Sequence, residues 1–553
     1  MHTSEPLSHF SNEYLRFLYE NWPTAALSDG MHAHDDRLED VDRSTIDNQA
    51  RELGGFARRL DRISTRTLTA DEQLERRMLT DHIRGQLFEL EEVRPWQTDP
   101  NYYAKLLARS LAGQTLFAYA PVEERARRVV SRLRQTPRLL EAAEANLEEP
   151  PGISIKTGAE TLDGVVAFIE RDLPRAFRQL EDLHLLGDLA DAATEATDSI
   201  GRFAVHLRET LAPKSRATFR LGSERFESRF RHRDGITLSK EQLLSVAERE
   251  LGHIQERFRR VASKVDAKKE AVDVWQQVRA HHPAAGELLH AVREQLTKLQ
   301  AFIKRNAIVT VPEEGEVAVA LTPEFCSRAN ASLWAPGPFE PKQLPSRYFI
   351  TDVSPAWTVE RGEEHLREIN YASLPSMLVN AVYPGRHLYC QHQRNIVESL
   401  RKSTLLAPAS FVAGWAHYAE QMMMEAGLAD GDDTQELGQL ARALVRAARM
   451  VVSVRLHTED MSVEQGVRFF REEAYLEDGR ARREAERGTY DPDYALETVG
   501  RLTLLKLRDD VTAKEGSAFS LKEFHDRLLG QGAVPLWLHR MLFLGDTGDA
   551  VLD

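Results

Sequence analysis

The chain has 553 residues, of which 42% are hydrophobic and 29% charged, as in soluble globular proteins with a large buried core. Its net charge of −14 argues against non-specific nucleic-acid binding, which needs a basic face. No apolar run approaches the ~20 residues that span a bilayer. The first residues lack the pattern of a secretory signal, and two cysteines, Cys326 and Cys390, cannot form a disulfide framework. We therefore expect a cytoplasmic protein that binds neither nucleic acid nor membrane.

Helical patterns dominate most of the chain. Residues 123–147 are rich in Glu, Arg and Leu, with apolar residues at helical spacing, and Pro137 is expected to split or kink this helix. Ser239-Lys-Glu-Gln242 has the capping-box pattern that begins a helix. The same pattern occurs at Ser462-Val-Glu-Gln465 and at Ser520-Leu-Lys-Glu523. The sequence therefore predicts long helices in both halves of the chain.

Strand patterns are confined to one zone between the two helical halves. Residues 308–311, 316–321 and 347–351 are short, rich in β-branched and aromatic residues, and bounded by Pro or Gly. Residues 334–341 contain three prolines, which favour a rigid loop at the edge of a cleft. The sequence thus predicts a small sheet.

The chain contains no evident flexible linker, so we expect one integrated unit with two lobes. Residues 1–305 are predicted to form a helical N-terminal lobe. Residues 306–553 are predicted to form the small sheet and a helical C-terminal lobe.

Two stretches of the second lobe carry the most informative pattern. Residues 378–387 read Leu-Val-Asn-Ala-Val-Tyr-Pro-Gly-Arg-His, and residues 411–420 read Phe-Val-Ala-Gly-Trp-Ala-His-Tyr-Ala-Glu. Together they resemble the bacterial family numbered as domain of unknown function 885, with its hallmark HExxPGHH or HExxPGHY followed by EGWAxYAE on a second helix. The resemblance covers most of the chain, with specific motifs only beyond residue 330. It implies a mainly α, large helical fold like that of HExxH zinc peptidases and carboxypeptidases, with a small sheet beside a deep cleft.

The groups that would do the chemistry of that hallmark are missing here. In an HExxH site two histidines on one helix face bind zinc, the glutamate activates a water, and a third ligand comes from another helix. By position, Asn380 replaces the first histidine, Ala381 the glutamate, Arg386 the second histidine and Ala413 the third ligand. Alanine has no donor atom, and the arginine stays protonated and would repel a dication. Zinc is expected for the family, but here we expect no metal, no cofactor and no catalytic residues.

The remaining groups permit an alternative site. His387, His417, Glu420 and His457 could converge, and three histidines with a carboxylate are a suitable ligand set for a relocated metal. The alternative interpretation is that His417 and His457 are hydrogen-bonded helix residues that shape the pocket. A Cys390–His387 pair is also possible, but a buried cysteine usually acts as a small apolar side chain.

Arg386 supports a more specific hypothesis. A guanidinium in the vacated metal position offers fixed charge and a planar fork of donors suited to a carboxylate. Alternatively, Arg386 pairs with Glu420 or another acidic residue and only fills the space. Helices at about 376–400 and 409–427 are expected side by side, and strand 316–321 could receive an extended ligand by strand addition. The predicted pocket residues are Tyr383, Arg386, His387, Trp415, His417, Tyr418, Glu420 and His457.

Three functions therefore compete. The favoured one is a pseudoenzyme, a metallopeptidase-like protein that has lost zinc binding and peptidase activity and keeps its pocket for a peptide or a carboxylate small molecule. The second is an active metal-dependent hydrolase or peptidase with the relocated site. The third is a structural or interaction protein whose cleft is incidental.

Overall fold

The computed structural model describes residues 6–313, 315–323, 330–546 and 552, so Cys326 lies outside the described residues. The fold is mainly helical with one small sheet, as the sequence predicted. The helices before the sheet are α1 (Leu7–Asn21), α2 (Pro23–Asp29), α3 (Arg43–Arg62), α4 (Ala70–Phe88), α5 (Pro95–Thr98), α6 (Pro100–Leu116), α7 (Val122–Asn146), α8 (Gly152–Ala167), α9 (Leu173–Ala176), α10 (Leu183–Val205), α11 (Ser223–Asp234), α12 (Lys240–Val265), α13 (Ala271–Arg279) and α14 (Leu288–Asn306).

The strands and the helices of the second half follow in chain order. They are β1 (Val317–Leu321), β2 (Ala331–Trp334), β3 (Ser346–Ile350), α15 (Val359–Glu368), α16 (Leu374–Ala381), α17 (Arg386–Arg394), α18 (Ser399–Lys402), α19 (Ala409–Glu425), α20 (Asp433–Thr458), α21 (Val463–Glu473), α22 (Asp478–Tyr490), α23 (Leu496–Glu515), α24 (Leu521–Leu529) and α25 (Leu536–Leu544). Among the described residues no helix is both long and apolar enough to cross a membrane.

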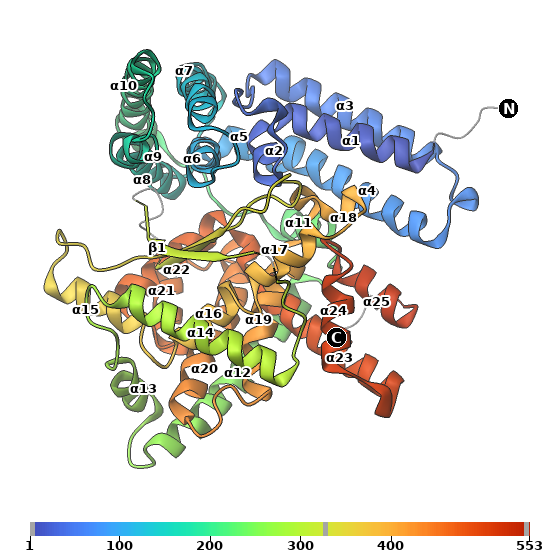
Figure 1. The fold of residues 1–553 in the computed structure, drawn as a ribbon, viewed down its shortest axis with the longest axis vertical. Coiled ribbons are helices and arrows are strands. Elements are labelled where there is room, and N and C mark those ends of the chain that lie inside the picture. The colour runs from blue at the N-terminus through green and yellow to red at the C-terminus, as the bar shows by residue number, and fades with distance from the viewer. Residues whose placement is uncertain (1–5, 314, 324–329, 547–551, 553) are drawn as a thin grey trace.

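Helices α1–α10 form the upper part of the molecule (Figure 1). Helices α1, α3 and α4 bury one apolar core, and α6, α7, α8 and α10 bury another. Helix α7 is not divided at Pro137, so that alternative of the prediction is wrong. Leu133 and Leu139, on either side of the proline, are both buried in the same core, and this packing holds the helix together despite the lost backbone hydrogen bond.

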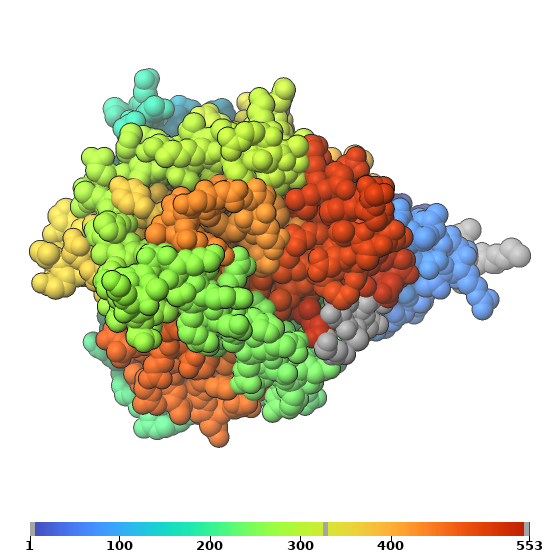
Figure 2. All heavy atoms as spheres, turned by 90° about the horizontal axis from the view of Figure 1, so that it is seen from below, coloured from blue at the N-terminus to red at the C-terminus, as the bar shows by residue number. Residues whose placement is uncertain are grey.

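Helices α11–α14 share cores with the helices that follow the sheet. Helix α12 packs along α20, and their apolar faces meet in one cluster with α13, α21 and α22. Helix α14 packs against β1 and α16 in a second cluster. Figure 2 shows the green residues of α12–α14 and the orange and red C-terminal helices on one continuous surface. The segments on either side of residue 305 therefore do not have separate cores.

The sheet has the strand order β1–β3–β2, with β1 parallel and β2 antiparallel to the central strand β3. The predictions for residues 316–321 and 347–351 are confirmed as β1 and β3. Residues 308–311 do not form a strand, because other side chains take their backbone groups: Asp526 accepts the hydrogen bond of the Thr310 N–H, and His525 bonds the carbonyl oxygen of Ile308. Strand β2 was not predicted.

Candidate functional site

The predicted motif forms a tight turn between two helices. Helix α16 ends at Ala381 and α17 begins at Arg386, with a cis Tyr383–Pro384 peptide between them. A Cβ on Gly385 would overlap the carbonyl oxygens of Val379 and Asn380, so only glycine fits this close approach. Helices α16 and α17 both pack against α19, as predicted.

A cavity of about 1020 Å³ lies beside this turn. Its walls come from α8, β2, α15, α16, α20 and α22, so both halves of the chain enclose it. Asn380, Ala381 and Arg386 line it. The first three substituted positions of the motif therefore face an open cavity, whereas Ala413 is not among its lining residues.

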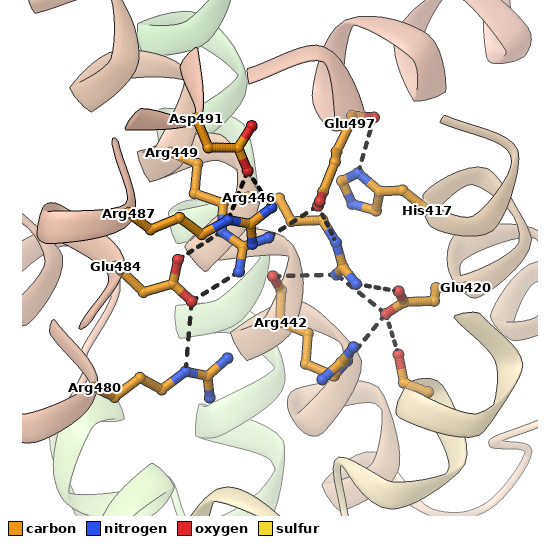
Figure 3. Close-up of polar contacts among 11 residues, drawn as sticks. His417, Glu420, Arg442, Arg446, Arg449, Arg480, Glu484, Arg487, Asp491 and Glu497 are labelled. Atoms are coloured by element: carbon orange, nitrogen blue, oxygen red, sulfur yellow. Dashed lines mark hydrogen bonds and ion pairs between the residues drawn. The ribbon is translucent and has the colours of Figure 1, made fainter. Parts of the chain in front are cut away.

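The lining of the cavity includes an apolar group and a basic group of side chains. The apolar group includes Leu321, Leu333, Val353, Trp357 and Met377. We call the basic group the arginine floor, which consists of Arg386, Arg442, Arg446, Arg449, Arg480, Arg483 and Arg487. The carboxylates that these arginines share are Glu368, Glu420, Glu484, Asp491 and Glu497, and Figure 3 shows this network without Arg386, Arg483 and Glu368.

The network is densely paired around Glu420 and Glu497. Arg446 Nη2 lies 2.6 Å from Glu420 Oε1, and Arg442 Nε lies 3.3 Å from Glu420 Oε2. The Ser376 hydroxyl also donates to Glu420. Glu497 Oε2 accepts from Arg446 at 3.1 Å and from Arg449 at 3.0 Å. Glu420 is fully buried, so these arginines supply the charge that its burial requires.

The other carboxylates connect α20 to α22. Arg449 Nη2 donates to Glu484 at 2.7 Å, and Arg480 lies 4.0 Å from Glu484. Burial alone would raise the pKa of Glu484, but Arg449 outweighs it and holds that pKa at about 2. Burial likewise opposes ionisation of Glu497, yet its arginine neighbours hold its pKa at about 2. Both carboxylates are therefore ionised at neutral pH.

Arg386 differs from the other arginines of the floor. Among the described residues no carboxylate lies within ion-pair distance of it, and its Nε is buried without a hydrogen-bond partner. Burial lowers its pKa, and the charge of Glu497 opposes that effect. Glu420 pairs with Arg442 and Arg446, so the Arg386–Glu420 pair of the alternative interpretation does not form.

Two of the predicted pocket residues, His387 and Tyr383, lie near the turn but do not point into the cavity. The His387 ring lies 3.0 Å from the Ser346 hydroxyl and 3.3 Å from the Gly315 carbonyl oxygen, and burial lowers its pKa to about 4. The ring of Tyr383 packs edge-on against His387. Neither side chain lines the cavity, because the tight turn directs both toward the sheet and α14.

The predicted pocket residues of α19 are buried in helix interfaces and do not line the cavity. Trp415 donates its indole N–H to the Pro384 carbonyl oxygen at 2.9 Å. The Tyr418 hydroxyl lies 2.9 Å from a ring nitrogen of His525. Neither side chain reaches this cavity, because this face of α19 packs on α16, α17 and α24.

His417, Glu420 and His457 also lie outside the cavity lining. His417 Nδ1 is 3.4 Å from the Glu497 carbonyl oxygen, and burial, with Arg446 and Arg501 nearby, lowers its pKa well below the usual value. His457 Nε2 is 2.7 Å from the Gly488 carbonyl oxygen. Both are hydrogen-bonded helix residues, as one interpretation of the sequence had it, but neither lines this cavity.

The donor set at this site does not fit zinc. Asn380 offers an amide, Ala381 nothing, and Arg386 a cation. Across the described ranges, no three His, Cys, Asp or Glu side chains lie close enough together to hold a metal ion. His387, His417, Glu420 and His457 therefore do not form the metal site of the alternative interpretation.

The arginine floor was missed from the sequence, although its spacing is visible there. Arg442, Arg446 and Arg449 are four and three residues apart and share one face of α20. Arg480 and Arg487 are seven apart on α22. Two arginine-rich helix faces can be recognised in this way, but which cavity they line depends on the packing of α20 against α22.

The fold and the site define a mainly helical protein with a small three-stranded sheet and an arginine-lined cavity. The chain belongs to the family described as bacterial protein of unknown function, DUF885, whose model matches residues 23–540. None of the curated proteins matches it.

Two solved structures share the fold. One, from Shewanella oneidensis, is called a putative lipoprotein of unknown function; it is 22% identical, has a TM-score of 0.80, and the match covers 98% of this chain and 100% of that one. The other, from Colwellia psychrerythraea, is also called a putative lipoprotein; it is 17% identical, has a TM-score of 0.80, and the match covers 96% of each chain. At these identities the likeness extends to the fold alone.

Proposed function

We propose that this protein is a non-hydrolysing relative of a metallopeptidase, whose cavity binds a carboxylate of a peptide or small molecule at Arg386. The observation that carries the proposal is the buried, unpartnered Nε of Arg386 at the wall of a cavity of about 1020 Å³. A buried polar group without a partner calls for an explanation, and a bound ligand supplies one. A guanidinium matches a carboxylate in both charge and shape.

The edge of β2 supports a peptide as the ligand. Asn330 and the β2 residues Ala331–Leu333 line the cavity, whereas only Leu321 of β1 does. In the antiparallel ladder with β3, the carbonyl oxygen of Asn330 faces Thr351, so alternation leaves the backbone groups of Ala331 and Leu333 on the outer edge. Strand addition, expected at residues 316–321, is therefore better placed at β2.

The alternative functions receive less support. An open cavity argues against a purely structural role, for which a cleft filled by side chains was expected. A relocated hydrolytic site would need ligands that converge, and the described part of the chain brings no such group together. The sequence predicts a cytoplasmic protein, whereas the two solved proteins described above are called putative lipoproteins. Cell fractionation distinguishes the two locations.

Replacing Arg386 with glutamine is expected to weaken peptide binding by about 10- to 100-fold, the loss of one charge-assisted hydrogen-bonded pair. The measurement is calorimetric titration with a tripeptide that has a free C-terminal carboxylate and with its C-terminal amide. Wild type should prefer the free carboxylate, and Arg386→Gln should bind both equally.

Arg482→Gln is the matched control, because Arg482 lies on α22 as Arg480 and Arg487 do but is exposed and paired with Glu464 outside the cavity. It should retain the preference. A wild-type protein that binds acid and amide equally would refute the proposal.

Restoring the missing groups together (Asn380→His, Ala381→Glu, Arg386→His and Ala413→Glu) is expected to increase zinc binding. The changes supply two imidazoles and a carboxylate ligand and remove a repelling cation. Zinc content after dialysis is measured for the variant and for wild type. No increase would show that these positions do not correspond to those of the family motif.

A further inference from the structure

We infer that the ligand of this cavity carries two negative charges, one held at Arg386 and the other between Arg442 and Tyr348. This inference rests on the proposed function and specifies the class of ligand for the same site.

The arginine floor contains more positive than negative charge. Its seven guanidinium groups share five carboxylates, which leaves an excess of two positive charges. Glu484 and Glu497 are ionised at neutral pH, so both already count fully in this balance. The chain as a whole has a net charge of −14, so the local excess opposes the overall charge.

Arg386 and Arg442 carry this excess positive charge. Arg386 has no carboxylate partner among the described residues. Arg442 shares Glu420 with Arg446, and its hydrogen bond to Glu420 uses Nε at 3.3 Å, while Arg446 makes the 2.6 Å contact (Figure 3). Burial lowers the pKa of Arg442 to about 10, so it stays protonated with an incomplete pair. Arg386 and Arg442 both line the cavity.

The hydroxyl of Tyr348 is a neutral hydrogen-bond donor near Arg442. Tyr348, on the central strand β3, lines the same cavity, and its hydroxyl is buried without a hydrogen-bond partner. Burial raises the pKa of Tyr348, and the charge of Arg442 opposes that rise. A protonated hydroxyl next to an incompletely paired guanidinium can donate to an anion together with it. The cavity thus presents two separate anion-binding positions, at Arg386 and at Arg442–Tyr348.

The test compares dicarboxylates with monocarboxylates of equal carbon number by calorimetry in low salt: succinate, glutarate and adipate against butyrate, pentanoate and hexanoate. In wild type the best dicarboxylate should bind at least about ten-fold more tightly than its partner, because the second carboxylate finds its own guanidinium. Arg386→Gln should abolish this preference, and Tyr348→Phe should reduce it. Arg386→Lys, which keeps the charge, and the outside control Arg482→Gln should retain it.

Sulfate, a dianion without a carboxylate, separates the two proposals. Equal binding of mono- and dicarboxylates would overturn the inference that the ligand carries two negative charges, but would leave the proposed binding of a carboxylate in place. Binding of two sulfates per protein without any carboxylate binding would overturn the proposed function and support two anion-binding positions, whereas binding of one sulfate would overturn both. If none of the seven anions binds, both are overturned. Thermal unfolding of each variant shows whether it is still folded. If Arg386→Gln is unfolded, the comparison of Arg386→Lys with wild type decides whether the charge at this position holds the ligand.

Discussion

Gly500→Ala is expected to lower the free energy of unfolding by about 3 kcal/mol, near the upper end of typical overpacking costs. Helices α19 and α23 cross closely at Gly414 and Gly500. A Cβ at Gly500 would overlap the carbonyl oxygen of Ser410 and lie 2.7 Å from the Gly414 Cα. These are backbone atoms, so the two helices must separate to accept the methyl group. Denaturant unfolding of both proteins measures the change.

Gly201→Ala is the matched control. Gly201 also lies inside a helix, α10, but a Cβ there meets nothing within 4 Å. Alanine should stabilise this position by about 0.5–1 kcal/mol, because it restricts the unfolded chain. If both substitutions shift the unfolding midpoint equally, the close crossing of α19 and α23 is wrong. The position of the Glu497 carboxylate, one turn before Gly500 on α23, would then be wrong as well.

The sequence predicted the fold best where the signals are local. The capping boxes at Ser239 and Ser462 begin α12 and α21 with the expected side-chain hydrogen bonds. Strand β2 was missed because Ala-Ser-Leu-Trp has no clear strand pattern, and its pairing with β3 is a contact between distant residues. Helices α12 and α20 share one apolar core, and this too depends on tertiary packing that local sequence patterns do not show.

The motif indicates the turn and one residue of this cavity, Arg386, whereas the other seven predicted pocket residues do not line it. Helical spacing shows that residues such as His417 and Glu420 share a side of α19, but it does not show what that side meets. In the structure Glu420 meets the arginines of α20, and His417 meets the backbone of α23. A family motif therefore locates a site more reliably than it identifies the lining of a cavity.

Glu497→Gln is expected to lower the free energy of unfolding at pH 7 by about 3 kcal/mol. Burial opposes ionisation of Glu497, but Arg449 and Arg446 outweigh it and lower its pKa from 4.5 to about 2. Each pKa unit corresponds to about 1.4 kcal/mol. Because the folded pKa is the lower one, the carboxylate stabilises the fold above pH 4.5, and this stabilisation is lost as the pH falls toward 2. Glutamine has no charge to lose, so the difference between wild type and variant should shrink over this range.

Glu486→Gln is the control for this pH dependence. Glu486 also lines the cavity, but it pairs at 2.6 Å with Lys156, whose side chain is 49% exposed. Such a pair contributes about 0–1 kcal/mol. Urea unfolding of all three proteins at pH 7, 5, 4 and 3 separates the two positions. A constant difference between wild type and Glu497→Gln across this series would mean that Glu497 does not act as an ionised partner of the arginine floor. The floor would then carry three excess positive charges, and the cavity would not match a ligand with two negative charges.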